Sequence, residues 1–139
     1  MSNIQPVQRI YSGAAALLAF SLGASSPCLA VDEISTVETA AKAGAETAEG
    51  KKFGDELGQA FGREHASTIR RCAKVTKRPD LSNFDLFVRV DGAGVVDQAL
   101  VNPATNLATC VKDAMPGWKV SAPTQAGFWV KVGVVLKGK

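Results

Sequence analysis

The chain has 139 residues, of which 46% are hydrophobic and 21% are charged, and its formal net charge is +3. This length suits a single domain, and this composition excludes a wholly disordered chain. A charge of +3 is too small to indicate nucleic-acid binding. One His and three Cys exclude a His-rich metal site and a four-Cys zinc site within one chain. We therefore expect no cofactor, no metal and no nucleic-acid partner.

Residues 1–30 have the pattern of a secretory signal sequence. Residues 13–22 form an apolar stretch, and Cys28 and Ala30 provide small side chains before an expected cleavage site after Ala30. An uncleaved membrane anchor is one alternative, although Gly, Ser and Pro dilute its hydrophobicity. Acylation at Cys28 is another, and Pro27 directly before it argues against it. The prediction is an exported protein that keeps no membrane anchor.

Residues 31–52 differ in composition from the rest of the expected mature chain. Residues 31–50 carry five acidic residues and one Lys, and they contain no aromatic residue. Residues 51–139 carry fourteen Lys or Arg and eight Asp or Glu. Ala and Glu favour helix, but an isolated helix of this kind is marginally stable in water. We expect residues 31–52 to be a disordered or partly helical tether that adds little stability to a domain over residues 53–139.

Residues 53–75 have apolar side chains at helical spacing. One stripe, with steps of three or four residues, contains Phe53, Leu57, Phe61, His65, Ile69 and Cys72. A second stripe beside it consists of Gly54, Gly58 and Gly62. These glycines either let another element approach closely or mark a helix end that frays. The sequence leaves both interpretations open.

Residues 84–101 are predicted to form an antiparallel β-hairpin. Residues 84–91 alternate strictly, so that Phe84, Leu86, Val88 and Val90 share one face and Asp85, Phe87, Arg89 and Asp91 share the other. The turn signal Asp91-Gly92-Ala93-Gly94 comes next, and residues 95–101 form the returning strand.

A helix and a final strand are predicted after the hairpin. Asn102 is the expected N-cap of the helix, and Pro103 is expected at its first position. Its apolar face contains Leu107, Cys110, Val111, Ala114 and Met115. The final strand, residues 128–136, places Trp129 and Lys131 on the face opposite to its main apolar row.

Cys72 and Cys110 remain after the expected cleavage, and each lies on the apolar face of a predicted helix. In an exported protein this even pair predicts one disulfide. The expected fold class is α+β. Two helices joined by the disulfide cover one face of a three-stranded antiparallel sheet, in the order α-β-β-α-β.

Four features of the sequence together suggest a family. They are the helix that carries Cys72, the strand-turn-strand FDLFVRVDGAGVVDQALV, the helix that carries Cys110, and the stretches GWKVSAP and GFWVKVGVVL. From about Arg63 to its end the chain resembles the TonB C-terminal domain superfamily, and more narrowly its paired-cysteine relatives, such as AgmX-type gliding-motility proteins. The resemblance implies a module that engages an envelope protein through a sheet edge or a helix face. The chain lacks the long Pro-rich spacer of TonB energy transducers, which argues against force transmission.

The residue inventory does not favour an enzyme. His65 lies on the apolar stripe with no Ser or Cys nucleophile beside it, so we expect a half-buried, hydrogen-bonded side chain rather than a catalytic base. Asp91 and Asp97 flank the hairpin turn, and turn chemistry accounts for Asp91. We expect no catalytic residue in this chain.

A basic cluster lies at the end of the first predicted helix. It contains Arg70, Arg71, Lys74, Lys77 and Arg78. If the helix continues, Arg70, Lys74 and Arg78 share one face. The cluster is either a solvated face that suits the helix dipole or a contact surface for an anionic envelope surface or acidic protein patch.

The sequence favours two functions, and an enzyme of uncharacterised activity is a third alternative that ranks below them. The first is a small periplasmic interaction module that binds an envelope protein along the edge of the final strand. There Trp129 supplies selectivity, and Lys131 discourages indiscriminate pairing. The second is a structural or inhibitory envelope protein that binds peptidoglycan, or another anionic envelope component, through the basic helix.

Overall fold

The computed structural model describes residues 29–137. The expected signal sequence lies outside them, apart from Leu29 and Ala30. The chain divides into two units after Glu33, and the unit that begins at Ile34 contains the sheet and the helices packed on it. Among residues 29–137, no helix is both long enough and apolar enough to cross a membrane.

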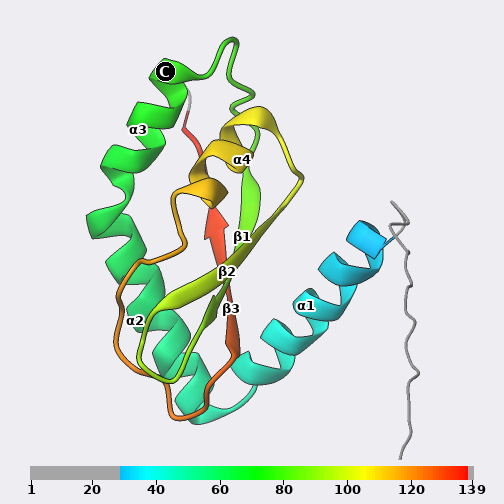
Figure 1. Ribbon diagram of the computed structural model, residues 1–139, viewed down its shortest axis with the longest axis vertical. Helices are drawn as coiled ribbons and strands as arrows, with labels where there is room; N and C mark the ends of the chain where they lie inside the picture. Colours follow the sequence, from blue (N-terminus) through cyan, green and yellow to red (C-terminus); the bar gives the residue numbers. More distant parts are fainter. Residues whose placement is uncertain (1–28, 138–139) are drawn as a thin grey trace, which may run out of the picture. The chain divides into compact units, whose positions relative to one another are not determined.

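The described chain is a mixed α+β structure (Figure 1). Its elements are α1 (Leu29–Ala45), α2 (Ala48–Glu64), α3 (Ala66–Val75), β1 (Phe84–Val90), β2 (Val96–Asn102), α4 (Asn106–Asp113) and β3 (Phe128–Val134). The strands form one antiparallel sheet in the order β2-β1-β3. The predicted α+β fold with a three-stranded antiparallel sheet is therefore confirmed.

Three helices, α2, α3 and α4, cover one face of this sheet. The main core lies between them and the sheet, and its largest members are Leu57, Phe61, Phe84, Leu86, Leu107, Met115 and Trp118. Burying a Leu or Phe side chain contributes about 1.5–3 kcal/mol. The apolar stripe predicted over residues 53–75 therefore holds these helices against the strands.

The predicted disulfide is also confirmed. Cys72 of α3 and Cys110 of α4 are bonded, with an S–S distance of 2.10 Å and a Cα–Cα distance of 5.8 Å. Cys72 is fully buried in the main core, and Cys110 packs against that core. The bond fixes the two helices to each other over the sheet.

The single helix expected over residues 53–75 is two helices that meet at His65. His65 caps α2 through the bond from its amide to the carbonyl of Phe61, 2.8 Å, and α3 begins at Ala66. The two helices have different packing partners, since α2 lies against β3 and α3 against α4. A bend at His65 allows both contacts.

The hairpin turn has the predicted chemistry. Asp91 Oδ1 accepts hydrogen bonds from the amides of Ala93 and Val95, each 2.9 Å. Gly94 has a φ of +83°, which glycine adopts without steric cost. A side chain at Gly94 would also meet the carbonyl oxygen of Val120. This position therefore requires glycine for two reasons, its positive φ and its close contact with Val120.

Helix α4 begins later than the sequence suggested. Thr105, not Asn102, is its N-cap, and the Thr105 hydroxyl accepts from the amide of Ala108, 3.1 Å. Pro103 precedes the helix instead of occupying its first position, and the Asn102–Pro103 peptide bond is cis. Asn106, which opens the helix, uses its side chain to hold the loop before β1.

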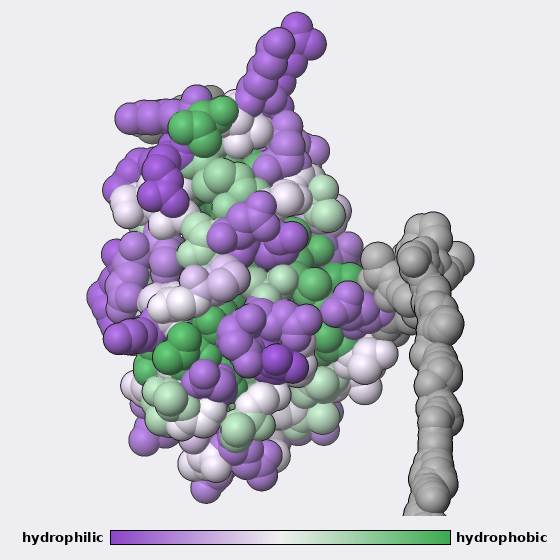
Figure 2. Space-filling view, viewed as in Figure 1, coloured by the Kyte–Doolittle hydropathy of each residue, from purple (hydrophilic) through white to green (hydrophobic). Residues whose placement is uncertain are grey.

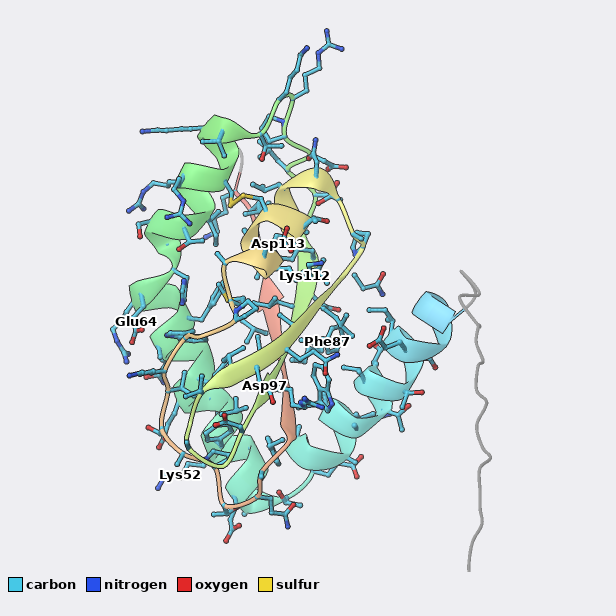
Figure 3. The ribbon with its side chains drawn as sticks, in the orientation of Figure 1. Lys52, Glu64, Phe87, Asp97, Lys112 and Asp113 are labelled. Atoms are coloured by element: carbon cyan, nitrogen blue, oxygen red, sulfur yellow. A yellow bond between two sulfur atoms is a disulfide. The ribbon has the colours of Figure 1, made fainter. Side chains whose placement is uncertain are left out.

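Residues 34–52 differ most from expectation. Residues 31–52 were predicted to form a disordered or partly helical tether with little to bury, and residues 34–45 and 48–52 lie in α1 and in the first turns of α2. Val37 and Ala41 are buried against Phe87, which is fully buried on the sheet face opposite to the main core. Phe87 points from β1 toward α1 (Figure 3). The segment therefore packs on the sheet, contrary to the expectation that it has little to bury, and the second face of the sheet is partly covered.

Candidate partner-binding site

Strand β3 lies at an edge of the sheet, as its place in the sequence suggested. β1 pairs with it on one side only, with Phe87 opposite Lys131 and Arg89 opposite Trp129. An edge strand presents every other backbone N–H and C=O group away from the sheet. These outward groups are the part of β3 that another extended chain can bind.

A groove runs beside this edge, between α1 and α2. It encloses about 370 Å³, and its walls are Glu38, Ala41, Lys42 and Ala45 of α1, and Gly50, Lys51, Gly54 and Asp55 of α2. The floor is formed by residues 128–131 of β3. On each helix the lining residues recur at the spacing of one helical face. A second hollow of about 730 Å³ lies beyond Phe128, beside residues 121–127.

Glycine brings the two walls together at the start of α2. Gly50 is buried, and a side chain there would meet the carbonyl of Gly44 and the ring of Phe128. Thr47 holds the corner between the helices, because its hydroxyl donates to the Gly44 carbonyl and accepts from the Gly50 amide, both at 2.9 Å. The groove is therefore built by a close approach that only glycine permits.

Trp129 has two roles in this geometry. It is half-buried, packs against the cluster of Phe87, Val37 and Ala41, and lines the groove. The Arg89 guanidinium lies 6.0 Å from the centre of its ring. Arg89 in turn donates to both carboxylate oxygens of Asp97, at 2.9 and 3.1 Å. This bidentate pair lowers the pKa of Asp97 and raises that of Arg89 through hydrogen bonding.

Lys131 is paired within the sheet. Its Nζ lies 3.3 Å from Asp85 Oδ2 on the neighbouring strand, and both side chains are partly exposed. The groove lining also contains Glu38 and Lys42 on α1, and Lys51 and Asp55 on α2. The site thus combines an apolar floor with charged groups of both signs.

The basic cluster lies elsewhere. Arg70, Arg71 and Lys74 are exposed on α3, and Lys77 and Arg78 follow in the turn after it. Because α3 ends at Val75, Arg78 does not share a helical face with Arg70 and Lys74, contrary to the sequence-based expectation; its φ is 51°. The groove opens beside the first turn of α2, whereas this cluster lies at the far end of α3 (Figure 1). The predicted site residues therefore form two separate surfaces.

His65 is the half-buried, hydrogen-bonded side chain that was predicted. Its Nδ1 lies 3.1 Å from the Thr68 hydroxyl, and its ring packs between Phe61 and Trp118 at centroid distances of 5.5 and 4.5 Å. Its Nε2 is buried and has no hydrogen-bond partner among the described residues. Trp118 Nε1 donates to Glu64 Oε2 at 2.7 Å, which fixes the ring that faces His65.

This environment predicts a pH dependence of stability. Burial lowers the pKa of His65 below its ordinary value of 6.5; Arg71 acts in the same direction and Glu64 opposes it. Below that value the unfolded chain binds a proton that the folded chain resists, so the free energy of unfolding falls as the pH decreases through it. Melting temperatures measured on both sides of pH 6.5 should show this decrease, and His65→Phe should reduce it. A pH profile of stability that is the same in His65→Phe would show that His65 does not cause the decrease.

Within residues 33–137, no three His, Cys, Asp or Glu side chains gather closely enough to hold a metal ion. Comparison of the chain with protein-family models, curated proteins and solved structures finds no match.

Sequence reasoning identified the edge strand but not the groove. The α1 wall, the Gly50 corner and the partner of Lys131, Asp85, were all missed. The glycine stripe contained part of the signal. A side chain at Gly54 would make only ordinary contact with Val130, at 3.7 Å, and one at Gly58 or Gly62 would meet nothing within 4 Å. In this structure the stripe is not used for close packing.

Proposed function

We propose that this chain is a small exported interaction module that binds an extended segment of an envelope protein along the outer edge of β3. One observation carries this proposal: the open edge of β3 borders a groove of about 370 Å³ between α1 and α2. A bound segment would hydrogen-bond to the outward backbone groups of β3. Its alternate side chains would point into the groove, where Trp129 and the charged wall residues select them.

The proposed compartment rests on two features of the chain. The first thirty residues have the pattern of a signal sequence, and the Cys72–Cys110 disulfide is compatible with an oxidising compartment. The resemblance to the TonB C-terminal superfamily is consistent with a partner in the periplasm of a Gram-negative cell. No enzymatic step is part of this proposal.

A matched pair of glycine variants tests the groove. Gly54→Gln would place a long side chain in the groove beside Val130, whereas Gly58→Gln, one turn later on α2, lies outside it. Both changes remove a glycine from a helix, so neither should lower the melting temperature. We expect Gly54→Gln to reduce capture of the partner from envelope extracts at least about tenfold, because a blocked groove cannot hold an added strand. Gly58→Gln should leave capture unchanged.

Trp129→Ala gives a second check on the same site. It removes one apolar side chain of the floor but not the backbone edge, so it should weaken capture and alter which segments are retained. Equal loss in Gly54→Gln and Gly58→Gln would contradict binding in the groove. Unchanged capture in both Gly54→Gln and Trp129→Ala would also contradict binding in the groove. It would favour the alternative, in which the basic cluster binds peptidoglycan, and binding to isolated cell wall would test that alternative.

A further inference from the structure

The end of the molecule at which α3 ends exposes aliphatic side chains. Val75 is 70% exposed, Leu81 is 50% exposed and Val135 is 67% exposed. They are the large hydrophobic residues that are exposed in the described part of the chain. They come from three segments that meet at this end: the last residue of α3, the loop before β1 and the segment after β3 (Figure 1).

Side-chain hydrogen bonds hold these segments in place. Asn106 of α4 donates from Nδ2 to the carbonyl of Arg78, 3.1 Å, and accepts at Oδ1 from the amide of Asp80, 2.9 Å. Asn83 Oδ1 accepts from the amide of Leu136, 2.8 Å, which ties the loop to the segment after β3. Leu81 thus lies in a loop that is anchored on two sides.

Positive charge surrounds these residues. The exposed cations at this end are Arg70, Arg71, Lys74, Lys77, Arg78 and Lys137. We call these six cations and the three aliphatic residues together the basic tip. Residues 66–83 contain five Lys or Arg and a single acidic residue, Asp80. Within residues 34–137, no carboxylate lies within ion-pair distance of any of these six cations. Figure 2 shows a hydrophobic side chain among hydrophilic ones where α3 ends.

We propose that the basic tip binds the surface of an anionic phospholipid membrane. Lys and Arg near such a surface are attracted to the lipid phosphates, while aliphatic side chains beside them enter the boundary between headgroups and acyl chains. A hydrated polymer such as peptidoglycan, or an acidic peptide, would be attracted to the cations alone. The three exposed aliphatic side chains therefore favour a lipid surface. The tip lies away from the groove, so one molecule can bind both.

Vesicle flotation of the full chain tests this proposal. The probes are vesicles of phosphatidylglycerol and phosphatidylcholine in equal parts, and vesicles of phosphatidylcholine alone, which measure the binding that does not depend on anionic lipid. Lys74→Gln with Lys77→Gln should weaken binding to the anionic vesicles about fivefold for each cation removed. Leu81→Gln with Val135→Thr leaves the charge unchanged and should weaken it about tenfold, because less aliphatic surface enters the bilayer. All four positions are exposed, so the fold should be unaffected.

The matched control is Lys51→Gln with Lys52→Gln. It removes the same charge from the start of α2, and Lys52 lies at the opposite end of the molecule (Figure 3). This variant should bind the anionic vesicles as the unchanged chain does. Absence of binding that depends on phosphatidylglycerol would overturn the proposal. So would binding that Leu81→Gln with Val135→Thr leaves intact, or an equal loss in the Lys51 and Lys52 control. Retention on isolated cell wall with no binding to vesicles would assign the tip to peptidoglycan instead.

Discussion

Replacing both Cys72 and Cys110 by Ala is expected to lower the free energy of unfolding by about 4 kcal/mol. The disulfide closes a loop between residues 38 positions apart, and the open loop gives the unfolded chain much more conformational freedom. In the folded chain the same bond joins α3 to α4 over the main core. Denaturant unfolding of the two proteins gives the difference directly.

Two further measurements make this prediction specific. Thiol labelling of the unreduced protein should find neither Cys72 nor Cys110 free, and a reductant should destabilise the unchanged chain but not the Ala variant. Two reactive thiols in the unreduced protein would contradict the bond. A stability unchanged by reductant would show that the helix contacts alone hold α3 and α4 in place.

Phe87→Ala is expected to lower the free energy of unfolding by about 3–5 kcal/mol. Phe87 is fully buried on the sheet face opposite to the main core, beneath Val37 and Ala41 of α1. Truncating it removes a large apolar side chain and leaves a cavity under the helix. Val135→Ala is the control, since Val135 is exposed and its truncation should change the stability by less than about 0.5 kcal/mol.

A pair of substitutions on α1 tests whether this helix covers Phe87 on the second face of the sheet. Ala41 is 4% exposed against Phe87, whereas Ala40 beside it is exposed. Ala41→Asp would place a charge in that contact and should destabilise the protein, while Ala40→Asp should not. Equal, small effects of Phe87→Ala and Val135→Ala, with no difference between the two Asp variants, would mean that α1 is the tether expected from the sequence.

Much of the sheet and its main core could be predicted from sequence because local signals agree there. Strict alternation marked β1 and β3, and the turn at Asp91 has a side chain that satisfies two amides. Cys72 and Cys110 lie on the apolar faces of predicted helices, and this pattern alone indicated that they pair. In each case a short-range pattern and the long-range packing require the same residues.

The α1 cover could not be predicted in this way, because it depends on a weak signal in each partner. Val37 and Ala41 are only two small apolar residues in an acidic, Ala-rich segment. Phe87 was the clue on the other side, since it is an aromatic residue on a sheet face expected to be open. The groove depends on α1, so the site was predicted only as far as its floor, Trp129 and Lys131.

For the basic tip, the sequence predicted the charged residues but not their arrangement in space. The cations of residues 70–78 are evident in the sequence, and a continuous helix would have lined up Arg70, Lys74 and Arg78. The helix ends at Val75, because the chain must turn there to enter β1. That turn, held by Asn106, is what places Leu81 beside the charged residues.

Amide hydrogen exchange of β3, measured with and without the captured partner, tests strand addition most directly. Alternate amides of residues 128–134 face away from β1 and should exchange quickly in the free protein. With the partner bound, those amides should exchange at least about tenfold more slowly. The amides bonded to β1, and those at the outer edge of β2, should not change. Unchanged exchange along β3, with slowing confined to α3 and the loop after it, would contradict binding at the edge strand.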